Sequence, residues 1–123
     1  MTQENKELLL KDLCCRLPYE VKISVNNKIE VLEGLGILDN VAEYGSFLSC
    51  DIEEVKPYLF PMSSMTEEQK FEIRSYLNSI EGKMIGMQGR AIYLIDWLNK
   101  HHFDHRGLIP MGLANDATGL NIY

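Results

Sequence analysis

Cysteine is scarce in this chain, and its spacing excludes most uses of that residue. The 123 residues contain three cysteines, Cys14, Cys15 and Cys50. An odd number leaves at least one thiol unpaired, and Cys14 and Cys15 lack the C-x-x-C spacing of a redox motif. We therefore expect free thiols in a reducing compartment. Cys14 is predicted to fill part of the core, and Cys15 to be partly exposed.

Long apolar runs and a basic N-terminal segment are also lacking. Glu4 and Glu7 lie among the first seven residues, and the apolar run at residues 8–10 stops at Lys11. An export signal would place positive charge before a longer apolar stretch. A membrane-spanning helix would need about 20 apolar residues. We expect a soluble, cytoplasmic protein that does not associate with a membrane.

Positive charge is in deficit. Twelve lysines and arginines stand against 18 acids, which gives a formal net charge of -6 at pH 7. The basic residues are scattered along the chain. Such a protein repels a phosphate backbone unless folding gathers basic residues on one face. A nucleic-acid-binding regulator is therefore the second alternative to the function favoured below.

No complete catalytic or phosphate-binding motif is present. The G-x-S-x-G elbow of a serine hydrolase is absent, and residues 34–40 lack the third glycine of a dinucleotide-binding loop. Gly34 and Gly36 are instead predicted to kink or end a strand. The sequence predicts no cofactor and leans against an enzyme.

All three histidines lie in one short segment, which makes it the main candidate for chemistry. His101 and His105 would share one face of a continuing helix, at the spacing used by two ligands of zinc sites. His102, Asp104 and the nearby Asp96 complete the candidate catalytic residues. A small metal-dependent enzyme that uses this cluster is the first alternative function.

Structural roles for the same residues are favoured over chemistry. Phe103, Asp104 and Gly107 indicate that the helix ends here, and no glutamate between His101 and His105 could act as a base. Histidines at a helix C-terminus also interact favourably with its free carbonyls and negative dipole end. Asp96 is expected to form an i, i+4 ion pair with Lys100.

Three helices are predicted from periodicity and end signals. The first covers residues 4–17, ends at Pro18, and leaves Asp12 outside its apolar stripe of Leu10, Leu13, Cys14 and Leu17. The second begins at a capping box formed by Thr66 and Gln69 and ends at Gly82. The third runs from about 90 to 102.

The remaining segments predict a small sheet and a packed tail. Alternating residues 19–25 and the apolar positions in 29–32 flank Asn26 and Asn27, the pattern of a β-hairpin. A short third strand is expected within 45–52, and residues 56–61 should lie extended over the core. Apolar residues in 108–123 predict an ordered C-terminal tail.

We therefore predict one α+β domain covering residues 1–123. It has an N-terminal helix, a small antiparallel sheet of two to four strands, two further helices and the ordered tail.

Three sequence blocks resemble a family of short uncharacterised proteins encoded by gut Bacteroidetes and by their phages and mobile elements. The blocks are LLLKDLC with RLPY (residues 8–19), KPYLFPMSSMTEE (56–68), and DWLNKHHFD with RGLIP and DATGLNIY (96–123). They cover about half of the chain, and the predicted sheet region diverges. The resemblance implies a small cytoplasmic accessory protein of phage or prophage origin, and it brings no catalytic residue.

The favoured function is non-enzymatic. The incomplete catalytic sets, together with aromatic residues in 56–61 and 93–97 that could form a contact surface, predict a protein-interaction or regulatory module. Its partner is expected to be a protein of unknown identity. The sequence makes no prediction about oligomeric state.

Overall fold

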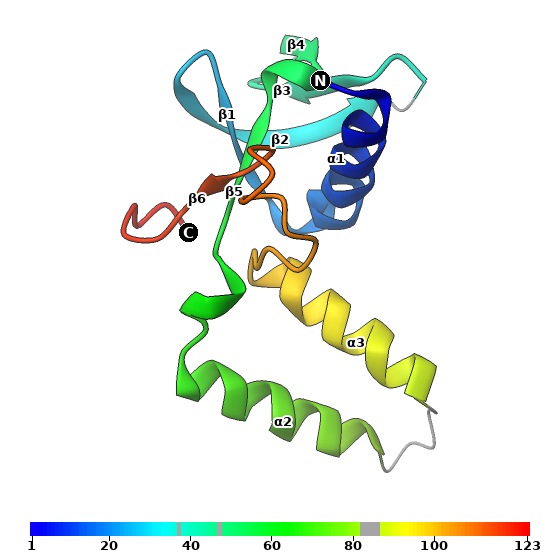
Figure 1. Ribbon diagram of the computed structural model, residues 1–123, viewed down its shortest axis with the longest axis vertical. Coiled ribbons are helices and arrows are strands. Elements are labelled where there is room, and N and C mark those ends of the chain that lie inside the picture. Colours follow the sequence, from blue (N-terminus) through cyan, green and yellow to red (C-terminus); the bar gives the residue numbers. More distant parts are fainter. Residues whose placement is uncertain (37, 47, 82–86) are drawn as a thin grey trace.

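A body of sheet and helix carries a projecting arm of two helices (Figure 1). The computed structural model describes residues 1–36, 38–46, 48–81 and 87–123. The α-helices in these residues are α1 (Gln3–Arg16), α2 (Glu67–Glu81) and α3 (Met87–Lys100). The strands are β1 (Lys22–Val25), β2 (Lys28–Gly36), β3 (Val41–Tyr44), β4 (Leu48–Asp51), β5 (Lys56–Leu59) and β6 (Asn115–Asp116). Short 3-10 helices follow α1 (η1, Leu17–Tyr19) and β4 (η2, Ile52–Glu54), and another precedes α2 (η3, Met62–Ser64).

The sheet is larger than predicted and mixed rather than antiparallel. Its order is β4-β3-β2-β1-β5-β6. All neighbours are antiparallel except β5 and β6, which pair in parallel. The prediction of two to four antiparallel strands was therefore wrong. The sequence pattern missed β3 and β6, because a two-residue strand such as β6 has no periodicity of its own and depends on a partner far along the chain.

The β1–β2 hairpin confirms the strongest strand prediction. Asn26 and Asn27 have φ angles of 50° and 63°, the left-handed values that a tight primed turn requires. The register of β2 against β3 shifts between Leu32 and Gly34. A Cβ atom on Gly34 would lie 2.6 Å from Glu43 Oε2, so a larger residue at this position would require the Glu43 side chain to move.

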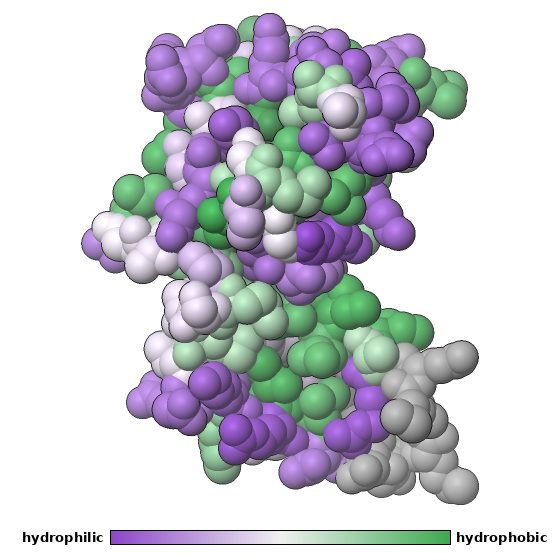
Figure 2. Space-filling view, viewed as in Figure 1, coloured by the Kyte–Doolittle hydropathy of each residue, from purple (hydrophilic) through white to green (hydrophobic). Residues whose placement is uncertain are grey.

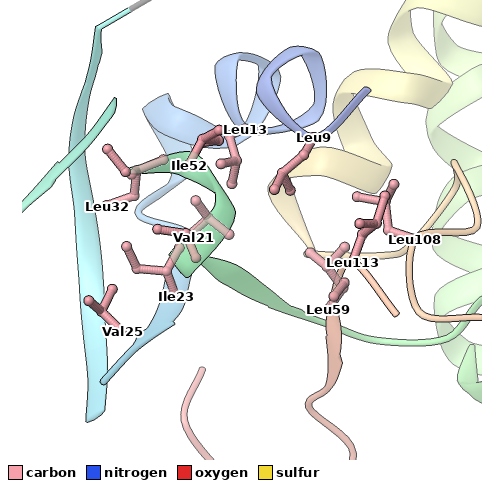
Figure 3. Packing of buried hydrophobic residues seen from close by; sticks show 13 residues of the cluster. Leu9, Leu13, Val21, Ile23, Val25, Leu32, Ile52, Leu59, Leu108 and Leu113 are labelled. Carbon is pink, nitrogen blue, oxygen red and sulfur yellow. The ribbon is translucent and has the colours of Figure 1, made fainter. Parts of the chain in front are cut away.

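The main core lies between α1 and one face of the sheet. Leu9 and Leu13 of α1 point toward Val21, Ile23 and Ile52, as Figure 3 shows. The C-terminal tail closes another side of this core through three buried residues, Leu108, Leu113 and Ala114. Pairing of β6 with β5 holds the tail in place. The tail is ordered, as predicted.

Helix α1 presents a different face to the core from the one predicted. Its buried residues are Leu9, Asp12, Leu13 and Arg16. Asp12 was placed outside the stripe and is fully buried, whereas Cys14, predicted to be buried, is exposed. Cys15 is partly exposed, as expected. The buried face of the helix includes two charged residues, Asp12 and Arg16. A pattern of apolar residues alone cannot predict such a face.

Helix α2 begins at the predicted capping box. The Gln69 backbone N–H donates to Thr66 Oγ1 at 3.1 Å, and the Thr66 N–H donates to Gln69 Oε1 at 2.9 Å. The predicted end at Gly82 lies outside the described residues. Helix α3 begins at Met87, earlier than expected, and ends at Lys100. In the described parts of the chain, no helix has the length and apolar character needed to cross a membrane.

Candidate functional site

The arm consists of α2 and α3, which pack against each other and meet the body at one end (Figure 1). Trp97, Leu98 and Phe103 are buried at its base. Four partly buried residues surround them, namely Phe60, Met65, Ile73 and Leu94. Farther along the arm, Tyr76 and Tyr93 meet edge to face with ring centroids 5.8 Å apart. This packing fixes α3 against the body at its C-terminal end.

A groove of about 370 Å³ lies between α3 and the end of α1. Its walls are Cys14, Cys15, Pro18 and Tyr19 on one side and Ile92, Ile95, Asp96 and Asn99 on the other. Ile92 is 67% exposed and Ile95 is 43% exposed. Three residues apart, they share one face of α3. Figure 2 shows hydrophobic residues gathered over α3, whereas the outer edge of α2 is hydrophilic.

A second apolar face of α3 is already covered. Leu94 and Leu98, four residues apart, pack in the cluster at the base of the arm. Positions 92 and 95 point to another side of the same helix, because successive residues turn by about 100°. Helix α3 is therefore apolar on two faces, and the one with Ile92 and Ile95 opens into the groove.

A hydrogen bond connects the two walls of this groove. The Tyr19 hydroxyl, from η1, donates to Asp96 Oδ1. This bond raises the pKa of Tyr19, because the hydroxyl must keep its proton to donate, and burial adds to the effect. Asp96 was expected to pair with Lys100, but the structure shows it as the acceptor of the Tyr19 hydrogen bond.

A smaller hollow of about 200 Å³ lies between α2 and α3. It is lined by Glu72, Tyr76, Asp96, Trp97, Lys100 and His101. The ring of His101 lies 4.1 Å from that of Trp97, measured between centroids. Burial lowers the pKa of His101 and Lys100 lowers it further, while Glu72 acts in the opposite direction. Asp96 and His101 are the two candidate residues that share this hollow.

The body contains a buried ion cluster centred on Asp12. Its carboxylate accepts from Arg16 Nε at 2.8 Å and from Arg106 Nη1 at 2.9 Å. The side chains of Asp12 and Arg16 are fully buried, and that of Arg106 is 17% exposed. Arg16 Nη2 also donates to the carbonyl oxygen of Phe103 at 2.6 Å. The cluster thereby ties α1 to the segment that follows α3.

His102 ends α3 in a conformation usually taken by glycine. Its φ angle is 63°. The His102 N–H donates to Asn99 O at 3.1 Å, and the Phe103 N–H donates to Leu98 O at 2.9 Å. These two bonds form a Schellman motif, with His102 at the position where glycine avoids the steric penalty of a Cβ atom. The packing of Phe103 with Leu98 completes the motif.

The side chain of His102 explains why a histidine occupies this position. Its ring stacks on Tyr123 with centroids 3.7 Å apart. The Tyr123 hydroxyl donates to Tyr58 O at 2.7 Å and accepts from the Lys22 N–H at 2.9 Å. Burial lowers the pKa of His102 to about 4, and the nearby positive charge of Arg16 contributes. His102 therefore clamps the C-terminal tail as a neutral ring.

Asp104 and His105 also have structural partners. Asp104 accepts hydrogen bonds from the backbone N–H groups of Leu108 at 2.8 Å and Ile109 at 2.9 Å, which caps the turn that begins the tail. His105 Nε2 lies 2.7 Å from Asn99 Oδ1. Burial, reinforced by the positive charges of Arg16 and Arg106, lowers the pKa of His105.

The five sequence candidates thus fall into separate environments. Asp96 and His101 line the hollow between α2 and α3, and His102 stacks on the tail. Asp104 and His105 lie beside the ion cluster and cap or brace the chain after α3. The predicted metal pair, His101 and His105, has different partners because α3 ends at Lys100 and the chain turns at His102, between them. Among residues 1–36, 38–46, 48–81 and 87–123, no three His, Cys, Asp or Glu side chains are grouped so that they could hold a metal ion.

The apolar pattern alone missed two features. The buried Asp12–Arg16 pair was signalled by opposite charges four residues apart, between Leu9, Leu13 and Leu17, but such pairs also occur on exposed helix faces. The exposure of Ile92 and Ile95 carried no local signal, because it depends on how far α3 extends beyond α1. The aromatic residues expected to form a contact surface are mostly covered: Trp97 is 6% exposed, and Tyr58 and Phe60 are half-buried.

Comparison of the chain with protein-family models, with curated proteins and with solved structures finds no match.

Proposed function

We propose that this protein is a protein-binding module whose docking surface is the groove between α1 and α3. The observation that carries the proposal is the exposure of Ile92 and Ile95 side by side on one groove wall. Single exposed apolar residues are common, but adjacent ones that line a hollow are typical of contact sites. Burying apolar surface contributes about 25 cal/mol per Å², so a partner that covers both side chains gains affinity.

The environment of the groove supports binding rather than catalysis. The Tyr19–Asp96 hydrogen bond connects its two walls, and the Asn99–His105 contact holds the side chain of a lining residue. Ordered walls reduce the entropy that is lost when a partner docks. The ordered groove supports a protein that acts through a protein partner, and the resemblance of three sequence blocks to a phage-associated family is the ground for proposing a cytoplasmic accessory protein of phage or prophage origin.

Placing charge in the groove is expected to weaken partner capture strongly. In the double variant Ile92→Glu/Ile95→Glu, two carboxylates would replace the apolar contact, and binding should weaken about 30-fold or more, as for a hot spot of about 2 kcal/mol. The measurement is quantitative mass spectrometry of proteins that immobilised wild-type and variant protein capture from cells that produce the chain.

Phe71→Glu is the matched control, since Phe71 is 70% exposed on α2 and does not line the groove. It introduces a comparable change on the same arm and should leave capture unchanged. Both variants alter exposed side chains, so their melting temperatures should stay close to that of the wild type. If every captured protein binds wild type and the double variant equally, the groove is not a docking surface.

A further inference from the structure

The shape and charge of the groove identify the class of partner, an inference that rests on the proposed function. We infer that the occupant is an amphipathic helix with an apolar stripe and basic flanking residues.

The walls of the groove favour a helix over other peptide conformations. Residues from α1, η1 and α3 form them, so the groove contains no strand edge to which an extended peptide could add. Grooves that bind polyproline segments are lined by several aromatic residues. Among the described residues that line this groove, Tyr19 alone is aromatic. From Ile92 to Asn99 the α3 wall runs for about 10 Å at 1.5 Å per residue. Two turns of a docked helix, with apolar residues at i, i+3 or i+4, and i+7, match this length.

Charge favours a basic partner over a second copy of the chain. Asp96 is exposed on the α3 wall, and Glu20 is exposed directly after the Tyr19 wall. Lys11 and Glu7, on the face of α1 that carries Cys14, contribute one exposed charge of each sign. Arg106 also reaches the groove wall, with Nη2 3.8 Å from Cys15 Sγ, but its charge is paired with that of the buried Asp12. The whole chain carries a net charge of -6, so two copies repel each other while a basic segment is attracted.

Cys14 provides an independent readout at the same place. It is exposed and lines the groove, whereas Cys50, part of β4, lies elsewhere and is partly buried. A helix seated in the groove would cover Cys14. Binding should therefore slow alkylation of Cys14 without changing that of Cys50.

The test is selection from a displayed library of four-turn helical peptides in which each position is apolar, basic or acidic. The probe is the full chain, with Ile92→Glu/Ile95→Glu protein for counter-selection. We expect enriched peptides to carry an apolar helical stripe and more Lys and Arg than Asp and Glu. Their affinity should fall at least tenfold on the double variant, and they should protect Cys14 from alkylation.

The charge argument is tested with Glu20→Gln/Asp96→Asn, which keeps the acceptor oxygen for Tyr19. This variant should bind the enriched peptides about three- to tenfold more weakly at 50 mM salt, with a smaller difference at 500 mM. Asp39→Asn, in the turn between β2 and β3, removes one negative charge outside the groove and should change affinity little.

Three results would overturn the inference: no enrichment above the counter-selected background, enriched peptides without helical periodicity or with acidic flanks, or sedimentation showing a dimer that Ile92→Glu/Ile95→Glu dissociates. In each of these cases the proposed function survives if capture of a cellular protein still depends on Ile92 and Ile95. If capture of a cellular protein does not depend on Ile92 and Ile95, the proposed function fails together with the inference.

Discussion

Replacing Asp12 with asparagine is expected to lower the free energy of unfolding by about 3 to 5 kcal/mol. Asp12 is fully buried and accepts hydrogen bonds from Arg16 at 2.8 Å and Arg106 at 2.9 Å. Asparagine keeps the size of the side chain and removes its charge, which leaves Arg16 as a buried cation without its counter-ion. Domains are stabilised by only about 5 to 15 kcal/mol, so urea unfolding, followed by Trp97 fluorescence, should show a much earlier transition.

Two further variants separate the loss of charge pairing from general damage. Arg106→Gln removes the more exposed partner and should cost about 1 kcal/mol, since Arg16 still pairs with Asp12. Asp12→Leu/Arg16→Met removes both buried charges and should be more stable than Asp12→Asn, because no uncompensated charge remains between those two positions. If Asp12→Asn unfolds within 1 kcal/mol of the wild type, the cluster does not hold α1 in place.

Local signals predicted the elements that do not depend on distant partners. The capping box at Thr66 and the Asn26–Asn27 turn were both identified correctly, because each is defined by side-chain and backbone chemistry within four residues. The breaks at Gly34 and Gly36 follow the same rule, since β2 shifts register at Gly34 and ends at Gly36. Turns, helix caps and strand breaks can therefore be predicted from the sequence where the residues that determine them lie within a few positions of one another.

The misassigned face of α1 has a different cause. Apolar periodicity favoured Leu10, Cys14 and Leu17, but the fold buries Asp12 and Arg16, because Arg106 and the Phe103 carbonyl, far along the chain, offer them partners. A buried charge is tolerated only where such partners meet it. The sequence near α1 contains Asp12 and Arg16 but not their distant partners, so the buried face of α1 could not be predicted from the helix sequence alone.

The histidine segment shows how one turn can divide a predicted site. The expectation that these residues serve helix termination and packing is met at His102, whose left-handed backbone ends α3. That single turn directs His101 toward Trp97 and His105 toward Asn99. Asp104, one of the candidate catalytic acids, is occupied by two backbone N–H groups of the tail. Its side chain is thus committed to the turn that starts the packed tail.

Stability is expected to fall as the pH drops from 6.5 toward 4, and His102 is the main cause. Burial, with the positive charges of Arg16, His101 and Lys22, lowers the pKa of folded His102 from 6.5 to about 4. Below pH 6.5 the unfolded chain binds a proton that the folded protein does not, so the unfolded state gains stability. Below about pH 4 both states are protonated and this contribution stops changing. A pKa difference of this size corresponds to about 3 kcal/mol.

The variant His102→Asn isolates this effect, since asparagine tolerates the left-handed backbone and does not titrate. It should be less stable than the wild type at pH 7, because the stack on Tyr123 is lost, yet lose less stability between pH 6.5 and 4.5. His101 and His105, whose pKa values are also lowered, should account for the remaining slope. Urea unfolding at half-unit pH steps, with the His102 ring titrated by NMR, provides both measurements. Equal slopes for the two proteins would place the acid sensitivity outside His102, and the tail would then be held independently of the charge on that ring.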